Sequence, residues 1–242
     1  TLPSAAASVA PVNADGDAKP DLLVLDGSPG RLLTYFGDGF GGFAALSTLT
    51  LAAAVTPGVL RFALGTLDGD AIDDVVTVDE VGAVQVALGT GAGAFVDAGH
   101  GDPAASFLGP DVTARLAGVF VALADFDAQP GTDLAVLDGA RASLAFFSGH
   151  GDGAFGAARV VSVRVLGDVL AIAPVTVGIG RPADLAVLSG DPADVGTPST
   201  LAVVRASDGG FGLGPTAVGT ARSIVPFDLD GDGLTDLLLP DE

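Results

Sequence analysis

The chain has 242 residues, 49% of them hydrophobic, and carries 30 acidic against 10 basic side chains, for a net charge of −20. Phosphates would be repelled by so acidic a chain, which argues against nucleic acids and anionic membrane surfaces as partners. The longest uncharged stretch, 39–60, contains four glycines and a Thr-Pro-Gly break and fits two strands better than a membrane span, so no membrane insertion is predicted. It has no cysteine for disulfides or thiolate chemistry, and 36 glycines and 15 prolines favour many short strands over long helices.

Five short apolar segments, each opened by an aspartate, recur along the chain. They begin at Asp21, Asp74, Asp133, Asp184 and Asp236, at spacings of 53, 59, 51 and 52 residues. Short runs of Leu, Val and Ala bounded by turn residues predict buried strands. The nearly constant spacing predicts an internal repeat.

A second strand and a glycine-rich turn follow each of the first four aspartate-led strands. The second strands are predicted over 32–36, 83–88, 143–147 and 201–205, and the turns end at Phe43, Phe95, Phe155 and Phe211. Glycine supplies the positive φ that tight turns require. Because the four phenylalanines recur at one position of the repeat, we expect them in the core between repeats. Each full repeat thus predicts four antiparallel strands.

The repeats span roughly 6–56, 57–111, 112–167, 168–220 and 221–242. One four-stranded sheet cannot bury both of its faces alone, so the repeats must stack, and radial stacking gives a β-propeller. We therefore predict a single all-β domain over 1–242, a β-propeller with four full four-stranded antiparallel blades and half of a fifth. Further polypeptide or another chain is expected to complete the ring. A β-sandwich is the alternative, although it does not predict such a repeat.

A loop rich in aspartate precedes four of the five aspartate-led strands. Counting the strand-opening aspartate as position 9, side chains with oxygen atoms recur at positions 1, 3, 5 and 9. The candidate metal ligands are Asn13, Asp15, Asp17 and Asp21 in the first loop; Thr66, Asp68, Asp70 and Asp74 in the second; Asp125, Asp127, Gln129 and Asp133 in the third; and Asp228, Asp230, Asp232 and Asp236 in the fifth. Oxygen ligands in a tight turn suit Ca²⁺, so we predict about three to four structural calcium ions. The fourth loop keeps only Asp184, and no ion is expected there.

Other interpretations of these loops fit less well. An EF-hand needs a glutamate at position 12, where this chain has strand residues, and zinc is disfavoured because the loops contain no Cys or His. Mg²⁺ prefers fewer protein ligands. Solvated aspartate turns without metal remain an alternative. Against it, the four carboxylates within 228–236 would repel one another without a cation.

The pattern Asp-x-Asp-Gly-Asp-Gly-x-x-Asp, followed by an apolar strand and a glycine turn ending in Phe, resembles the FG-GAP/VCBS repeat. That repeat builds the propeller of integrin α-subunits and of many bacterial surface proteins. The match is specific at 228–239, good in the first three repeats and weak in the fourth. The resemblance implies a propeller whose aspartate loops hold structural Ca²⁺. It does not imply a ligand, because members of the family bind different partners.

No nucleophile elbow, P-loop or HExxH motif occurs, so we predict a protein that is not an enzyme. The leading hypothesis is a calcium-stabilised extracellular binding or assembly module, acting in cell-surface adhesion or protein–protein interaction. An alternative is a carbohydrate-binding lectin propeller, although the chain has no Trp and a single Tyr for sugar stacking. The propeller of a polysaccharide-degrading enzyme is less favoured, because clustered catalytic residues are lacking.

The predicted calcium loops also suggest where the protein is located and which of its faces binds a partner. Sites of this kind bind Ca²⁺ with a Kd of about 10⁻⁴ to 10⁻³ M, which predicts an extracellular, cell-surface or periplasmic protein. The longest irregular segments, 97–111 and 189–200, are expected on the face opposite the calcium loops. Because loops on a rigid scaffold carry function, we predict that this face binds a protein partner or assembly subunit, with a glycan as a further possibility.

Overall fold

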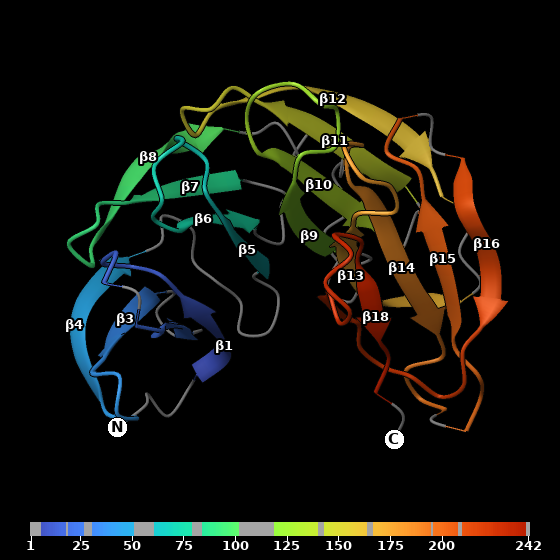
Figure 1. Ribbon diagram of the computed structural model, residues 1–242, viewed down its shortest axis with the longest axis horizontal. Helices are drawn as coiled ribbons and strands as arrows, with labels where there is room; N and C mark the ends of the chain where they lie inside the picture. Colours follow the sequence, from blue (N-terminus) through green and yellow to red (C-terminus); the bar gives the residue numbers. More distant parts are fainter. Residues whose placement is uncertain are drawn as a thin grey trace. The chain divides into compact units, whose positions relative to one another are not determined.

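The computed structural model describes residues 6–17, 19–26, 31–50, 61–78, 84–101, 119–139, 143–163, 167–194, 196–207 and 210–240. All regular secondary structure within these ranges is β-strand, which confirms the all-β prediction (Figure 1). No helix in the described ranges is long and apolar enough to cross a membrane.

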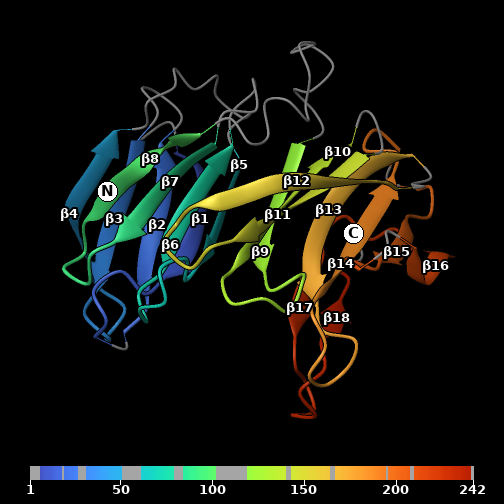
Figure 2. The same ribbon diagram turned by 90° about the horizontal axis from the view of Figure 1, so that it is seen from above.

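The strands form four four-stranded sheets and one two-stranded ribbon, and within each the strands are neighbours in chain order (Figure 2). The residues of each sheet fall inside one of the sequence repeats. The sheets contain β1 (Ala6–Val12), β2 (Asp21–Asp26), β3 (Arg31–Gly37) and β4 (Phe43–Thr50); β5 (Arg61–Gly65), β6 (Asp74–Val78), β7 (Val84–Gly89) and β8 (Phe95–Gly101); β9 (Val119–Ala124), β10 (Asp133–Asp138), β11 (Ser143–Gly149) and β12 (Phe155–Ser162); and β13 (Asp168–Val175), β14 (Asp184–Gly190), β15 (Thr200–Val204) and β16 (Phe211–Ala217). The ribbon contains β17 (Val225–Phe227) and β18 (Asp236–Leu238).

Each aspartate loop is the hairpin connection between the first two strands of a sheet. The strand-opening aspartate always pairs with the residue just before the loop. These pairs are Val12↔Asp21, Gly65↔Asp74, Ala124↔Asp133, Val175↔Asp184 and Phe227↔Asp236. The five loops therefore begin and end at equivalent points, so equivalent loop positions can be compared directly.

Contacts group the chain into two compact units. One comprises Thr1–Val112 with Gly149–Ala154, and the other Thr113–Ser148 with Phe155–Glu242. The first unit thus contains the first two sheets. The second contains the third and fourth sheets, apart from the turn between β11 and β12, together with the ribbon.

In the second unit, strand β14 is buried on both faces. Leu185 and Val187 join a core cluster with residues of the third sheet, such as Leu137. Ala186 and Leu188 join a different cluster, against which Leu237 of the ribbon packs. Successive side chains of a strand point to opposite faces. Burial of both faces therefore explains why the sequence of β14 is apolar without interruption from Leu185 to Leu188.

In the first unit, the core between the two sheets contains Leu23, Leu25 and Leu32 of one sheet and Val75 and Ala87 of the other. This packing removes apolar surface from water that neither sheet could bury alone.

The prediction that the turn-ending phenylalanines lie in the core is right at one position and wrong at another. Phe95 is 8% exposed and belongs to the core cluster of the first unit, whereas Phe43 is 47% exposed. Phe36, at the end of β3, packs against this cluster instead. Phe155 is partly exposed, and the side chain of Phe211 lies outside the described residues.

Gly93, in the turn before β8, is required by both conformation and space. Its φ is 76°, and a Cβ atom there would lie 1.7 Å from Cζ of Phe36. The Gly93 N–H also donates a hydrogen bond to the carbonyl of Ala14 in the first aspartate loop, at 3.2 Å. The repeated glycine turn therefore serves close contact between sheets as well as chain reversal.

Replacing Gly93 by alanine should lower the free energy of unfolding by about 2–4 kcal/mol, because left-handed strain and overpacking against Phe36 add together. Gly91→Ala in the same turn is the matched control. Its φ is 66°, but a Cβ there would meet Ile72 at an ordinary 3.5 Å, so only about 1–2 kcal/mol should be lost. Urea unfolding followed by circular dichroism compares the two, and equal losses would contradict the contact.

Candidate functional site

Four of the five strand-opening aspartates are buried. Asp21, Asp74, Asp133 and Asp184 have exposed fractions of 0 to 6%. In four loops, one carboxylate oxygen accepts a hydrogen bond from the backbone N–H seven residues earlier, at loop position 2. The pairs are Ala14 to Asp21 at 3.0 Å, Leu67 to Asp74 at 2.5 Å, Phe126 to Asp133 at 2.7 Å and Leu229 to Asp236 at 2.9 Å.

In three of the sheets, a carboxylate oxygen of the strand-opening aspartate also accepts a hydrogen bond from at or just beyond the end of the third strand. The N–H of Gly37 donates to Asp21 at 3.0 Å, that of Gly89 to Asp74 at 2.8 Å, and that of Ala206 to Asp184 at 3.1 Å. At Asp21 and Asp74, one buried carboxylate therefore joins an aspartate loop to the end of a strand 15 or 16 residues later in the chain. Each carboxylate oxygen has a further lone pair, so this role does not prevent metal binding.

Asp74 shows the electrostatic strain of this arrangement. Burial raises the pKa of its carboxyl group, and the negative charges of Asp68 and Asp70 raise it further, while the N–H groups of Leu67 and Gly89 oppose them. Since the folded state disfavours the ionised form, this group's contribution to stability is lost as pH rises through its raised pKa. A cation in the second loop would offset that loss.

At loop positions 3 and 5, the aspartates form local turns. One oxygen of each accepts the backbone N–H two residues later, as from Asp232 to Asp230 at 3.2 Å and from Leu234 to Asp232 at 2.8 Å. The same contacts recur at positions 3 and 5 of the first and second loops, and in the third loop at positions 1 and 3, through Asp125 and Asp127. The loop shape is therefore encoded by aspartate itself, as in solvated aspartate turns.

Loop position 4 adopts a left-handed backbone in four loops. Gly16, Gly69 and Gly231 occupy it with φ between 77° and 83°, and Ala128 adopts it at 63°. A side chain makes that conformation costly by about 1–2 kcal/mol. The third loop keeps the common shape despite lacking glycine there.

The predicted ligands converge in two of the four loops. One oxygen each from Asp125, Asp127 and Asp133 lie within 4.8 Å of one another, and the same holds for Asp228, Asp230 and Asp236. Among the described residues, the carboxylates of the first and second loops form no such group. The third and fifth loops are therefore the better candidates for a cation. Hard oxygen donors of this kind suit Ca²⁺.

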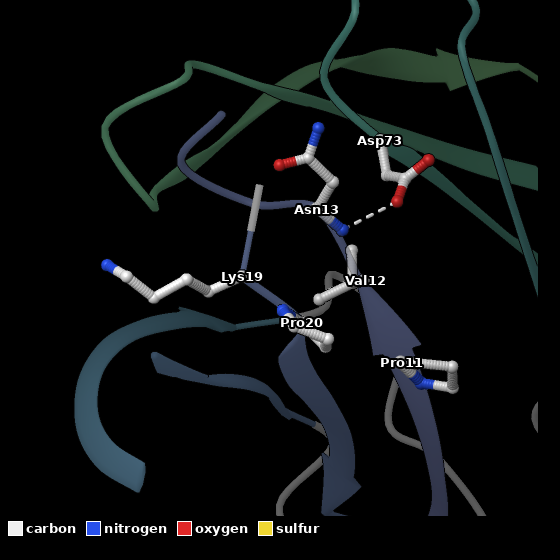
Figure 3. Close-up of a pocket in the computed structure, with 6 residues that line it drawn as sticks. All are labelled: Pro11, Val12, Asn13, Lys19, Pro20 and Asp73. Atoms are coloured by element: carbon white, nitrogen blue, oxygen red, sulfur yellow. Dashed lines mark hydrogen bonds between the residues drawn. The ribbon is translucent and has the colours of Figure 1, made fainter. Parts of the chain in front are cut away.

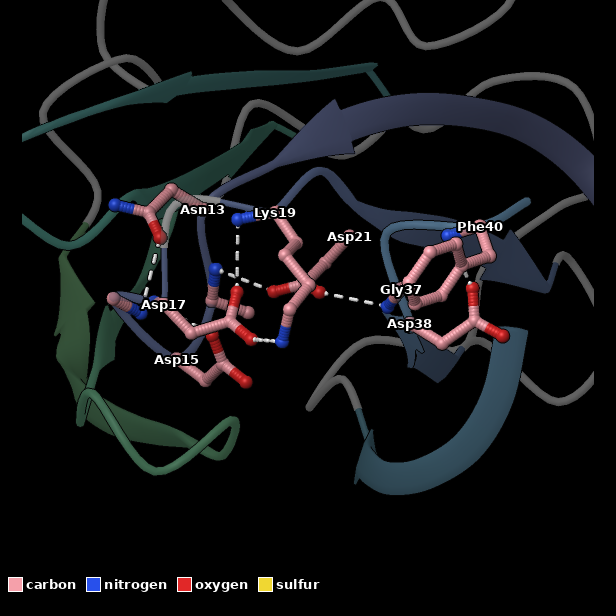
Figure 4. Close-up of polar contacts among 10 residues, drawn as sticks. Asn13, Asp15, Asp17, Lys19, Asp21, Gly37, Asp38 and Phe40 are labelled. Atoms are coloured by element: carbon pink, nitrogen blue, oxygen red, sulfur yellow. Dashed lines mark hydrogen bonds and ion pairs between the residues drawn. The ribbon is translucent and has the colours of Figure 1, made fainter. Parts of the chain in front are cut away.

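The first loop contains its own positive charge. Lys19, the only lysine of the chain, forms an ion pair with Asp17 (Figure 4). This hydrogen bond lowers the pKa of Asp17 and raises that of Lys19, and the negative charges of Asp15 and Asp21 raise the Lys19 pKa further. The ammonium group thus supplies part of the charge balance that a metal would otherwise give.

Loop position 8 connects adjacent sheets, a role that sequence analysis missed. In the first unit, Asp73 N–H donates to the Asn13 carbonyl at 3.0 Å, and Asn13 N–H donates back to Asp73 Oδ2 at 2.7 Å. In the second unit, Thr235 N–H donates to the Thr176 carbonyl at 2.9 Å, and Thr176 N–H donates to Thr235 Oγ1 at 2.8 Å. The available signal was a short polar side chain just before the strand-opening aspartate.

A hollow of about 390 Å³ lies beside this connection in the first unit (Figure 3). Its lining residues are Pro11, Val12, Asn13, Lys19, Pro20 and Asp73. They come from the end of β1, the first aspartate loop and the second aspartate loop. The hollow therefore combines two proline rings with an ammonium, a carboxylate and an amide group.

The two segments predicted to form a binding face are only partly described. Residues 102–111 lie outside the described ranges. The segment 189–200 is held by hydrogen bonds: Ser199 Oγ donates to the Ala221 carbonyl at 2.7 Å, and Arg222 Nη2 to the Asp194 carbonyl at 2.6 Å. A hydrogen bond from Thr197 Oγ1 lowers the pKa of Asp194. A partner on this face stays a prediction.

Comparison with solved structures shows what the fold of this chain is similar to. No protein-family model and no curated protein sequence matches the chain. Among solved structures, the chain is similar to a lectin from Agrocybe aegerita that recognises non-reducing terminal N-acetylglucosamine, with a TM-score of 0.59 and 19% identity. The match covers 86% of this chain and 50% of the lectin chain, so this chain spans about half the length of that protein. At this identity the likeness concerns the fold.

Asp184→Ala should lower the free energy of unfolding by about 1–3 kcal/mol, because it leaves the buried Ala206 N–H without its acceptor. The loss should be the same in Ca²⁺ and in chelator, since the fourth loop has no carboxylate at positions 1, 3 or 5. Asp168→Ala, at the exposed start of β13, is the control. Urea unfolding that found equal stability for both variants would contradict the proposed role of the buried carboxylate.

Proposed function

We propose that this chain is a non-catalytic carbohydrate-binding module built as a β-propeller with cation-binding loops. The observation that carries the proposal is the fold likeness, over 86% of the chain, to a lectin that recognises a terminal sugar. The succession of four-stranded sheets and the resemblance of the loops to FG-GAP/VCBS repeats support the propeller arrangement. The likeness favours the carbohydrate hypothesis over the protein-adhesion hypothesis that the sequence placed first.

An exposed aromatic ring supports sugar binding despite the small number of aromatic residues. Tyr35 is buried in β3, but Phe40, in the turn between β3 and β4, is 95% exposed. The Phe40 N–H donates to Asp38 Oδ1 at 2.7 Å, which fixes the backbone of that turn. An apolar ring on a fixed turn offers a stacking surface for the C–H face of a sugar.

Calcium is proposed as a structural ion of the third and fifth loops, where the carboxylates converge. The first and second loops have the same spacing and are weaker candidates. A Kd of about 10⁻⁴ to 10⁻³ M would fill such sites outside the cytoplasm, which supports an extracellular or periplasmic location. In this proposal the ion stabilises the scaffold and does not contact the sugar.

A glycan array probed with the labelled chain tests the carbohydrate function. We expect binding to a restricted set of glycans, and Phe40→Ala should weaken it about three- to tenfold through loss of stacking. Leu229→Ala removes another highly exposed apolar side chain, in the fifth loop, and should leave binding unchanged. An array without signal from the folded wild-type chain would contradict the proposal.

Calcium binding is tested by thermal and urea unfolding with Ca²⁺ and with chelator. At a hundredfold excess over Kd, each occupied site should add about 2.7 kcal/mol, and Asp230→Asn should remove one such increment. Asp191→Asn, an exposed aspartate of the connection between β14 and β15, should respond to Ca²⁺ like the wild type. A wild-type chain indifferent to chelator, or equal responses from both variants, would rule out a structural ion in the fifth loop.

A further inference from the structure

We propose that the hollow lined by Pro11, Val12, Asn13, Lys19, Pro20 and Asp73 is a binding subsite for one neutral pyranose ring. The inference rests on the proposed carbohydrate function and names the place and class of ligand. It is carried by the size of the hollow, by the pairing of donor and acceptor groups around it, and by its fixed walls.

The size of the hollow suits a small ligand. Its volume of about 390 Å³ lies near the lower end of the roughly 300–1,000 Å³ usual for ligand pockets. A single sugar ring fits this range better than a long chain held along its whole length. A polysaccharide could still bind by its terminal residue.

The polar groups of the hollow can bind sugar hydroxyls. The ammonium of Lys19 has three N–H donors, one of which bonds to Asp17. The carboxylate of Asp73 accepts the Asn13 N–H through Oδ2, and its Oδ1 accepts no hydrogen bond from the described residues. A hydroxyl group both donates and accepts, so neighbouring hydroxyls can bind a donor and an acceptor together.

The apolar groups complete the match. Pro11 and Pro20 line the hollow with rings whose conformation is fixed, so they lose no side-chain freedom when a ligand binds (Figure 3). They can cover the C–H face of a pyranose while one of its hydroxyls meets the Asp73 carboxylate. Ligands with a mixed surface of this kind are bound by sites with few, well-placed polar groups.

The charge of the hollow favours a neutral sugar. The positive charge of Lys19 is balanced by Asp17, so the charge left at the hollow is the negative charge of Asp73. The whole chain also carries a net charge of −20. An anionic sugar such as a uronic acid would be repelled, and the uncharged hydroxyls of a neutral pyranose would not.

The walls of the hollow are held in place by the connection between the first two sheets. The backbone N–H of Asp73 donates to the Asn13 carbonyl, and the backbone N–H of Asn13 donates to the Asp73 carboxylate. Asn13 Nδ2 donates to the Ala71 carbonyl at 2.9 Å. The two loops therefore present their side chains in a fixed relation. A preorganised site binds with less loss of conformational freedom than one formed on binding.

Nuclear magnetic resonance of the ¹⁵N-labelled full chain tests the subsite with methyl pyranosides of N-acetylglucosamine, galactose, glucose and mannose. We expect at least one to shift the amide signals of Val12, Asn13, Lys19 and Asp73 in a saturable way. Methyl glucuronide should bind more weakly than methyl glucoside. Pro11→Phe should fill the hollow and weaken binding at least tenfold.

Val9→Phe is the matched control, because Val9 is exposed on the same strand and lies two residues before Pro11, on the same face of β1. Binding by the wild type that Pro11→Phe leaves intact, or shifts confined to other residues, would overturn the subsite and leave the carbohydrate function standing. Absence of binding to both the pyranosides and the glycan array would overturn both. The two failures are therefore distinguishable.

Discussion

The structure depends on a buried aspartate at the start of the second strand of each sheet. At Asp21 and Asp74 the carboxylate accepts backbone N–H groups from both the preceding loop and the end of the third strand. Asp133 accepts one from its loop, and Asp184 accepts that of Ala206, just after the third strand. A charge can be buried when several hydrogen bonds replace its water, and leaving these N–H groups without an acceptor would be costly. The need for an acceptor for these buried N–H groups explains why this aspartate is present in every loop while the other loop residues differ. The fourth loop has lost the other acids but keeps Asp184.

We call this buried carboxylate and its backbone hydrogen bonds the aspartate clamp. The other features of the loops add to it. Position 8 connects neighbouring sheets, as Asp73 does with Asn13, and the same connection forms the wall of the hollow. Among the remaining acids, Asp17 of the first loop forms an ion pair with Lys19 of the same loop. In the third and fifth loops position 7 is Gly131 or Leu234, and the carboxylates converge without a basic neighbour at that position. Loops of the same spacing thus differ in whether a basic side chain accompanies their carboxylates.

Much of the fold could be predicted because the strands are local patterns. Apolar runs after Asp21, Asp133 and Asp184 are strands β2, β10 and β14, and the loop spacing located every first hairpin. The core role of Phe43 was wrong, because a repeat position does not reveal whether a neighbouring sheet covers it. The hollow could not be read from sequence, since Pro11, Pro20 and Asp73 meet only through packing of two sheets. The ion and the sugar remain proposals, because aspartate turns have the same spacing with or without a metal.

Amide hydrogen exchange tests the aspartate clamp most directly. The N–H groups of Leu67, Gly89 and Phe126 donate to buried carboxylates and should exchange as slowly as core strand amides, in Ca²⁺ and in chelator alike. The N–H groups of Asp70 and Asp127, which donate to exposed aspartates in the same loops, should exchange faster. Equal, fast exchange of both sets would show that the buried aspartates do not hold the loops to the sheets.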